Sequence, residues 1–217
     1  SILQIFYFMK YFLFACISLC CFFAQSSEVV IRGKTAGFSD SHINAYLTKD
    51  YITSSLEKVS SASIEDGQFF LSVPLEKTQK LTLTIEDKST SLFVEPGQVY
   101  NINLSYSEEL NEGKIYDKFL SIKFPYPTPT GLNELIASFN KEYDQFFQQN
   151  YKKVFLGLAA NDVEAFVKKM QNAEKYQTIR FLQEYVQYAT ANLLDISGVP
   201  DKQLKNDFLN NKPILYH

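Results

Sequence analysis

The chain has 217 residues, a mass of 24.9 kDa and a formal net charge of −3 at pH 7. With 21 basic and 24 acidic residues, it lacks the strongly basic surface of proteins that bind duplex DNA or RNA. Hydrophobic residues make up 46% of the chain, which excludes disorder over most of its length. The length allows one large domain or two small ones.

Residues 1–27 differ in composition from the rest of the chain. Lys10 follows Met9, and an apolar run over residues 11–24 leads to small and polar residues at 24–27. This order predicts a secretory signal peptide that starts at Met9, with residues 1–8 lying upstream of the natural product. The alternatives are a retained membrane anchor and a lipoprotein modified at Cys20, although Leu19 stands where lipoproteins normally need a small residue. We therefore expect a periplasmic or cell-surface protein, with membrane contact only through a retained leader or a lipid anchor.

All three cysteines, Cys16, Cys20 and Cys21, lie in this leader. The part that remains after export would contain no cysteine. A structural disulfide, a thiolate nucleophile, a CxxC redox pair and a cysteine zinc site are therefore excluded from it.

From Glu28 to about Phe124, apolar residues recur with a period of two, which is typical of strands with one buried face. We expect seven short strands near 29–33, 42–49, 58–65, 68–74, 80–86, 91–95 and 98–106. Turn sequences separate them at 65–68, 95–98 and 111–114, each containing glycine. Pro74 should end a strand, because it cannot donate to a ladder. The pattern predicts an antiparallel β-sandwich over 28–124.

A proline-rich linker follows at 125–130, and the period then becomes helical over 131–217. Asn161 resembles a helix N-cap, with Glu164 placed to complete a capping box. Apolar residues from Ile179 to Ile196 form a seam spaced by three and four, which Gly198 should end. A short helix over 201–209 is expected last. The fold class is therefore α+β, an antiparallel sandwich followed by a helical domain.

Few residues in this sequence carry a recognisable chemistry. His42 follows Asp40 and Ser41, but triad groups normally converge from separate loops, so we expect a polar residue at a strand start. The acidic pairs at 108–109 and at 162 and 164 are expected to be solvated charges rather than a glycosidase pair. His217 ends the chain and has no partner in the sequence pattern. We predict no catalytic, cofactor-binding or metal-binding residue and no cofactor, and the sequence does not identify binding residues.

Aromatic residues are unusually frequent in the helical part. They are expected to pack in a core, since aromatic side chains supply large buried areas. The functional alternative is a groove for a peptide, a lipid or a sugar, although the absence of tryptophan counts against sugar stacking. The residues concerned are Phe139, Tyr143, Phe146, Phe147, Tyr151, Tyr176, Phe181, Tyr185 and Tyr188.

The leader, the sandwich and two turn motifs, DGQF at 66–69 and LFVEPGQ at 92–98, carry a family resemblance. The chain resembles the N-terminal region of Bacteroidota envelope proteins that end in a thioredoxin-like, TlpA-type domain. The resemblance covers 28–106 well and 130–217 loosely. It implies a periplasmic or surface protein with a redox partner domain, which this sequence lacks.

Three hypotheses follow from these observations. The first is an exported, non-catalytic module that serves interaction or positioning, with an envelope protein or a downstream thioredoxin-like domain as its partner and no nucleic acid. The second is the front part of a thiol-disulfide oxidoreductase whose CxxC domain lies beyond residue 217, because residues 210–217 read as the start of a further segment. The third is a binding protein that uses an aromatic groove. We expect this chain itself not to be an enzyme.

Overall fold

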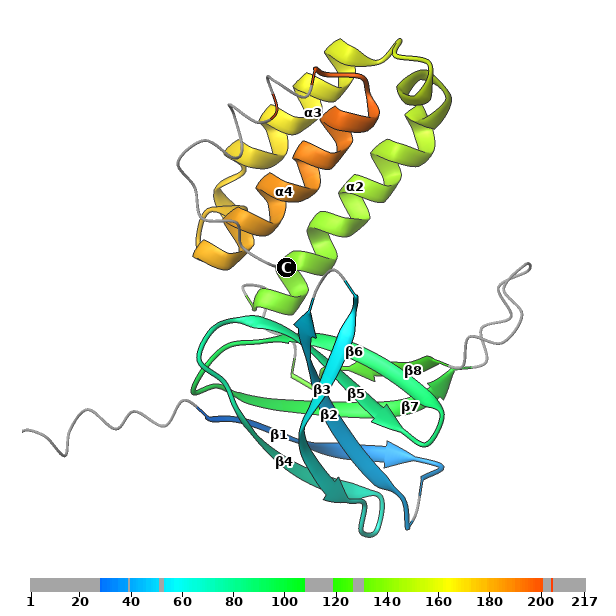
Figure 1. Cartoon of the computed structure of the whole chain (residues 1–217), viewed down its shortest axis with the longest axis vertical. Helices are drawn as coiled ribbons and strands as arrows, with labels where there is room; N and C mark the ends of the chain where they lie inside the picture. Colours follow the sequence, from blue (N-terminus) through cyan, green and yellow to red (C-terminus); the bar gives the residue numbers. More distant parts are fainter. Residues whose placement is uncertain are drawn as a thin grey trace, which may run out of the picture.

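The computed structural model describes residues 28–38, 40–50, 53–107, 119–126, 131–200 and 204. A β-rich unit comes first, and a helical unit stands on one end of it (Figure 1). Residues 1–27 and most of 201–217 lie outside the described part. The predicted leader, the turn at 111–114, the acidic pair at 108–109 and the last helix therefore fall largely outside it as well.

Eight strands build the first unit within the described residues. They are β1 (Glu28–Ala36), β2 (His42–Asp50), β3 (Ser55–Ser63), β4 (Gln68–Pro74), β5 (Gln79–Ile85), β6 (Lys88–Val94), β7 (Val99–Ser107) and β8 (Phe119–Lys123). Hydrogen bonds join them in the order β3-β2-β5-β6-β8-β7-β1-β4. The first and last strands of this order, β3 and β4, also contact each other, because the sheet folds over its own core in two layers.

The alternation in the sequence explains which face of each strand is buried. Phe69, Leu71 and Val73 of β4 lie in the core, and the residues between them do not. The same period buries Leu81, Leu83 and Ile85 of β5. Burial of these apolar side chains is the main stabilising term of the unit.

Two predicted turns connect these strands as expected. Asp66 and Gly67 both have positive φ, as a type I′ hairpin requires, and the turn is closed by two hydrogen bonds between Glu65 and Gln68. Gly97 has φ of 75°, which is the third position of a type II turn after Pro96. β4 ends at Pro74, as predicted.

The predicted fold class is confirmed, with two additions. The sequence predicted seven strands, and the structure adds β8, whose Leu120 is buried in the sandwich core. Most neighbouring strands are antiparallel, but β1 pairs with β7 in parallel, and β6 pairs with β8 in parallel at a single position, Ser89 with Phe119.

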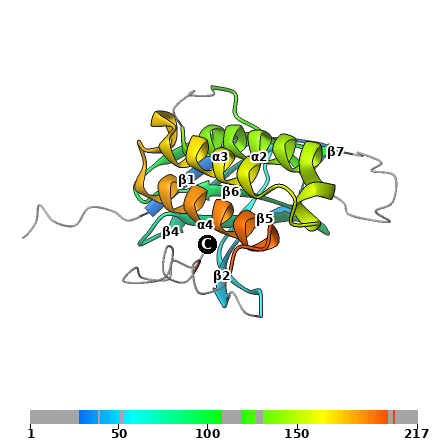
Figure 2. The same ribbon diagram turned by 90° about the horizontal axis from the view of Figure 1, so that it is seen from above.

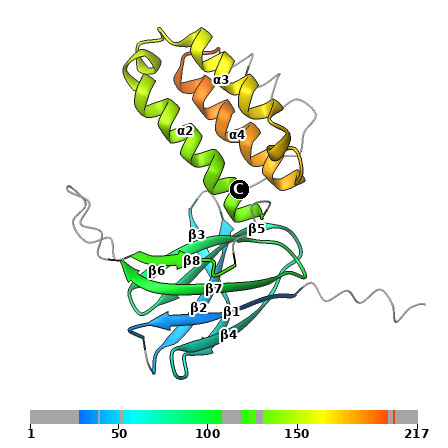
Figure 3. The same ribbon diagram turned by 180° about the vertical axis from the view of Figure 1, so that it is seen from behind.

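In the part of the second unit that the structure describes, there are three α-helices and one 3₁₀ turn. They are α2 (Leu132–Phe155), α3 (Ala160–Asn172), η2 (Glu174–Tyr176) and α4 (Arg180–Ile196). α2 rises from the sandwich, and α3 and α4 pack beside it (Figure 3). Seen from above, the helices lie side by side over the end of the sandwich (Figure 2). Among the described residues, no helix has the length and apolar character needed to cross a membrane.

The predicted capping box at Asn161 is wrong. α3 begins at Ala160 with Ala159 as its N-cap, and no side chain caps it. Ala159 and Val163 are both buried, so packing of the first turn sets the start of the helix and leaves Asn161 exposed inside it. Burial of apolar groups thus outweighs a capping hydrogen bond of about 1 kcal/mol.

The predicted end of α4 is confirmed. Gly198 has φ of 87°, and its N–H donates to the Asp195 carbonyl, while the Val199 N–H donates to the Leu194 carbonyl. These two bonds form a Schellman motif, which satisfies the last carbonyls of the helix. The predicted seam is buried at Leu182, Val186 and Leu193.

Candidate functional site at the junction of the two units

The side chain of Asn133 attaches the helical unit to the edge of strand β6, where that strand has no neighbouring strand among the described residues to pair with. β8 pairs with β6 only at Ser89, so in the described part the same edge of β6 has no strand opposite Phe93. Asn133, in the first turn of α2, accepts a hydrogen bond from the Phe93 N–H at 2.8 Å and donates one to the Phe93 carbonyl at 2.8 Å. Both backbone groups are therefore satisfied, as they would be in a ladder.

The ring of Phe93 continues this contact into the helices. Its centroid lies 5.5 Å from that of Phe181 and 5.7 Å from that of Tyr185. Tyr185 in turn lies 5.8 Å from Phe139, which is buried at the centre of the helical core. Edge-on aromatic pairs of this kind contribute about 0.5–1.5 kcal/mol each beyond their buried area. A continuous aromatic path thus links the sheet to the bundle.

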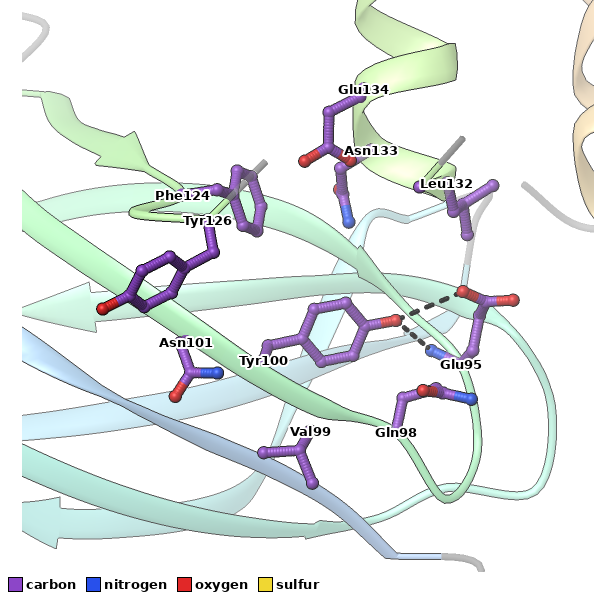
Figure 4. A pocket seen from close by; sticks show the side chains of 11 residues that line it. Glu95, Gln98, Val99, Tyr100, Asn101, Phe124, Tyr126, Leu132, Asn133 and Glu134 are labelled. Carbon is purple, nitrogen blue, oxygen red and sulfur yellow. Dashed lines mark hydrogen bonds between the residues drawn. The ribbon is translucent and has the colours of Figure 1, made fainter. Parts of the chain in front are cut away.

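A cavity of about 320 Å³ lies beside this attachment, between β7, the segment after β8 and the start of α2 (Figure 4). Both units contribute to it, so its shape depends on how they are held together. The residues that line it are Glu95, Gln98, Val99, Tyr100, Asn101, Phe124, Tyr126, Gly131, Leu132, Asn133 and Glu134.

Tyr100 lies at the centre of this junction cavity (Figure 4). Its hydroxyl accepts a hydrogen bond from the Glu95 N–H at 3.0 Å and lies 3.5 Å from Glu95 Oε2, to which it donates. Burial raises the pKa of Tyr100 well above its ordinary value, and the charges of Glu95 and Glu134 raise it further. Burial thus keeps the phenol neutral, and its hydroxyl both accepts and donates a hydrogen bond.

The charges around the junction cavity are negative. Glu95 and Glu134 both line the cavity, and their charges contribute to the raised pKa of Tyr100. Phe124 and Tyr126 add aromatic surface, and the Tyr126 side chain is 83% exposed at the rim. Carboxylates beside aromatic faces favour a positively charged group by Coulomb attraction and by cation–π contact.

A second cavity, of about 350 Å³, shares Asn101 and Tyr126 with the first. It carries the opposite charge, because Arg32 and Lys34 of β1 line it. Arg32 Nε donates a hydrogen bond to Asn101 Oδ1 at 2.8 Å. This bond fixes the side chain of Asn101, which lies between the two cavities. The two cavities thus form one surface along β7, acidic near the helices and basic farther away.

Gly33 is required where this surface crosses β1. A Cβ atom at residue 33 would lie 1.9 Å from the Ile102 carbonyl oxygen and 3.1 Å from the Phe69 ring. Backbone cannot move away as a flexible side chain can. Only glycine therefore allows β1 and β7 to approach this closely.

A separate polar cluster ties the helices together. Glu142 of α2 accepts hydrogen bonds from Lys175 at 2.8 Å, Lys169 at 3.0 Å and the Tyr176 hydroxyl at 3.0 Å. Burial raises the pKa of Glu142, but the hydrogen bonds from Lys175, Lys169 and Tyr176 together lower it to about 2. The carboxylate thus joins α2 to α3 and η2.

The candidate residues from the sequence do not converge. Ser41 Oγ donates to Glu86 at 3.0 Å, while His42, the first residue of β2, lies 3.4 Å from Ser63 Oγ. Ser41 and His42 therefore have different partners, and no Asp40–His42–Ser41 relay is formed. Asp162 and Glu164 are exposed on α3. Among the described residues, no cluster of three or more His, Cys, Asp or Glu could hold a metal ion.

Most of the helical aromatic residues pack against one another. Phe139 and Tyr176 are fully buried with ring centroids 5.7 Å apart, and Phe146 stacks on Phe166 at 4.3 Å. Neither of the two cavities is lined by the residues that the sequence suggested for a groove. The prediction of an aromatic core is therefore favoured, with Tyr151 as an exposed exception.

Sequence reasoning did not identify the residues of the junction. Tyr100 was expected only as one position of an alternating strand, and Asn133 fell at the start of a helix without a distinguishing pattern. A signal was present at Glu95, which opens the EPGQ turn just before Tyr100. No local pattern, however, indicates that Asn133 reaches a backbone 40 residues earlier.

Comparisons with known proteins find a family match for the first unit. Residues 29–131 match a family model described as a domain of unknown function, DUF4369. The match covers the sandwich and ends immediately before α2, which is just under half of the chain. The search of curated proteins finds no match.

A solved structure from Bacteroides fragilis, of a protein named provisionally for cell adhesion, is also similar. The identity is 11% and the TM-score 0.23, with 48% of this chain and 46% of that chain covered. The chain thus spans less than half the length of that protein. A likeness at this TM-score supports no inference about function.

Proposed function

We propose that this chain is a non-catalytic interaction and positioning module of an exported cell-envelope protein. The sandwich holds the helical unit in a fixed orientation, and a partner contacts the surface where the two units meet. The observation that carries the proposal is the junction cavity, because both units line it and the Asn133 contact fixes its shape.

The chemistry of the junction supports a partner rather than a reaction. Burial holds Tyr100 protonated, and its hydroxyl is hydrogen-bonded to Glu95, so the two residues form a fixed polar feature of the cavity wall. Glu95 and Glu134 instead suit a lysine, arginine or amine group of a partner. Arg32 and Lys34, farther along β7, suit an acidic group of the same partner.

Photo-cross-linking in the exported protein tests this proposal. A benzoylphenylalanine at Tyr126 should give a discrete adduct, because this side chain is exposed at the rim of both cavities. The double change Glu95→Gln and Glu134→Gln should lower the adduct yield at least several-fold. The same probe at Phe70, which is exposed on β4, is the matched control. Equal yields at the two positions, or a yield unaffected by the double change, would refute the interaction site.

Location is a separate part of the proposal. Expressed from Met9 in a diderm bacterium, the product should lose its leader and appear outside the cytoplasm. Recovery of the full-length product from the cytosol would contradict it.

The runner-up proposal is the front part of a thiol-disulfide oxidoreductase. Its support is the resemblance of residues 28–106 to envelope proteins with TlpA-type domains, a segment that overlaps the family match over 29–131. The reading frame after the codon for His217 decides it. A CxxC motif within the next couple of hundred codons would support the oxidoreductase, and its absence would remove it.

A further inference from the structure

The corner between α2 and α3 exposes a cluster of large apolar side chains. Phe155, Leu156 and Leu158 have exposed fractions of 66%, 70% and 72%, and Tyr151, one turn earlier, is 45% exposed. Exposed apolar residues are ordinary when scattered, but a contiguous group at one place marks an interaction site. We call these four residues the apolar tip.

Buried neighbours hold the apolar tip outward. Val154 and Ala159, on either side of the corner, are 0% and 1% exposed and belong to the helical core. Between them, Gly157 has φ of 67°, a conformation that turns the chain sharply. The Leu158 N–H closes the corner by donating to the Lys153 carbonyl at 2.8 Å. The apolar side chains are therefore displayed by a defined turn.

Basic residues accompany the apolar tip. Lys152 and Lys153 are exposed in the last turn of α2, and Lys152 Nζ lies 5.8 Å from the Tyr151 ring. The nearest acidic residues in sequence are Asp144, which precedes Tyr151 on α2, and Asp162, which lies beyond the buried Ala159 on α3. Apolar side chains flanked by lysine and tyrosine are the composition of segments that anchor at a membrane interface.

The shape and size of the apolar tip argue against a protein as its main occupant. It lies at the end of the helical unit away from the sandwich and projects as a helix corner (Figure 1). A stable protein interface buries about 800 Å² on each partner, which four partly exposed side chains cannot supply. A bilayer surface accepts a small convex group, because lipids rearrange around it.

We propose that the apolar tip inserts into the interface of a membrane that contains anionic lipids. Phe155, Leu156 and Leu158 would enter the boundary between headgroups and acyl chains, with Tyr151 at headgroup level. Lys152 and Lys153 would contact lipid phosphates. This membrane contact is independent of the predicted leader and of the partner proposed for the junction cavity.

A tryptophan reporter tests the insertion locally. The chain contains no tryptophan, so Phe155→Trp gives a single reporter at the apolar tip, and Phe70→Trp gives one on β4 as a control. The full chain is mixed with vesicles of phosphatidylcholine and phosphatidylglycerol, with or without brominated acyl chains. We expect a blue shift and bromine quenching for the reporter at the apolar tip and neither for the reporter on β4. The control is needed because the leader can bind vesicles by itself.

Further variants in the Phe155→Trp background separate the two contributions. The double change Leu156→Ser and Leu158→Ser should lower the apparent partition coefficient at least about ten-fold, since two leucine side chains that would enter the lipid are lost. Lys152→Gln and Lys153→Gln should each lower it about five-fold on anionic vesicles and little on neutral ones. Circular dichroism checks that the helices are retained.

Three results would overturn the proposal. If the emission of the Phe155→Trp variant does not respond to vesicles, the apolar tip does not insert. Emission already blue-shifted without lipid and dependent on protein concentration would show that a second copy covers it. A blue shift without lipid that is independent of concentration, and lost on truncation after Pro200, would show that the chain's own C-terminal segment covers it.

Discussion

The two units of this protein build their cores in different ways. Most of the buried residues of the sandwich core are aliphatic, and every one of them comes from residues 29–120. The buried residues of the helical core are also mostly aliphatic, but several aromatic residues pack around them, and one of these, Phe93, belongs to the sandwich. The sandwich core thus includes no helical residue, whereas the helical core is completed by the sheet.

This difference makes the dependence between the units one-sided. Loss of the helices would expose Phe93 and free two backbone groups of β6, which water can satisfy. Loss of the sandwich would remove an aromatic contact and the support of the first turn of α2. A small helical unit with an incomplete core has little stability to spare. The comparison predicts that a substitution that destabilises the sandwich also destabilises the helical unit. A substitution that destabilises the helical unit should affect the sandwich less.

Separating the units should give the largest effect. Residues 28–126 alone should unfold cooperatively as a monomer, because their core is complete. Residues 131–217 alone should be molten or self-associate, because their aromatic core lacks Phe93. Near-ultraviolet circular dichroism, thermal unfolding and sedimentation of both fragments measure this.

A cooperative, monomeric transition for the isolated helical fragment would break the comparison. Addition in trans of the sandwich fragment provides the control. It should restore helical tertiary structure only when Phe93 is present.

Gly33→Ala should give the largest effect of a single substitution. The new methyl group would meet the Ile102 carbonyl at 1.9 Å, so β1 and β7 must separate, at a cost of about 3 kcal/mol or more in unfolding free energy. Chemical denaturation of the chain, followed in each unit by hydrogen exchange, should show both units destabilised. Gly37→Ala is the matched control. Gly37 has positive φ, but its Cβ would meet no atom within 4 Å, so the cost should be about 1 kcal/mol.

Phe93→Ala sharpens the comparison at the contact itself. Phe93 is half-buried against Phe181 and Tyr185, so its loss should destabilise the helical unit by about 2 kcal/mol and the sandwich much less. Hydrogen exchange resolved by residue gives the two values separately. Phe70→Ala, at an exposed position of β4, should change neither. Equal losses in both units would mean that they unfold as one, and the one-sided dependence would be rejected.

Asn133→Ala should act at the same contact with a smaller effect on stability. It leaves the Phe93 N–H and carbonyl without their partner, which costs about 1–2 kcal/mol and loosens the helical unit on the sheet. Spin labels on Cys substituted at Phe70 and Lys168 should give a broader distance distribution than in the parent. Cys16, Cys20 and Cys21 are replaced first, so that only the two introduced cysteines are labelled. Asn161→Ala, an exposed amide on α3, is the matched control and should leave the distribution narrow.

Glu142 should give the smallest effect, visible as a dependence on pH. Its pKa in the folded protein is about 2, below the ordinary value of 4.5, so the folded state favours the charged form. The stabilisation is complete above about pH 4.5 and is lost as the pH falls towards 2. Glu142→Gln should lower stability by about 1 kcal/mol at pH 7 and flatten the acid dependence. Glu164→Gln, whose carboxylate is exposed 4.0 Å from Lys168, should leave the dependence intact.

Local patterns were sufficient for the elements but not for their assembly. The alternation in β4 and β5 and the glycines at 67, 97 and 198 predicted strands and turns that the structure contains, because side-chain period and positive φ are local properties. β8 was missed because only Leu120 and Ile122 carry its apolar face. The capping box at Asn161 failed because a buried alanine, not a polar side chain, decides where α3 begins.

The sequence by itself determined the α+β order, most strand faces, the absence of cysteine after residue 21 and the end of α4 at Gly198. These follow from residue type, spacing and backbone conformation, each of which acts over a few residues. Only the tertiary structure decided that β1 lies parallel to β7 and that Asn133 contacts Phe93. It also decided that residue 33 must be glycine, because a Cβ there would clash with the Ile102 carbonyl. Such pairings join residues that are tens of positions apart. The packing of the whole core decides which distant groups come together, so no short segment of the sequence predicts these contacts.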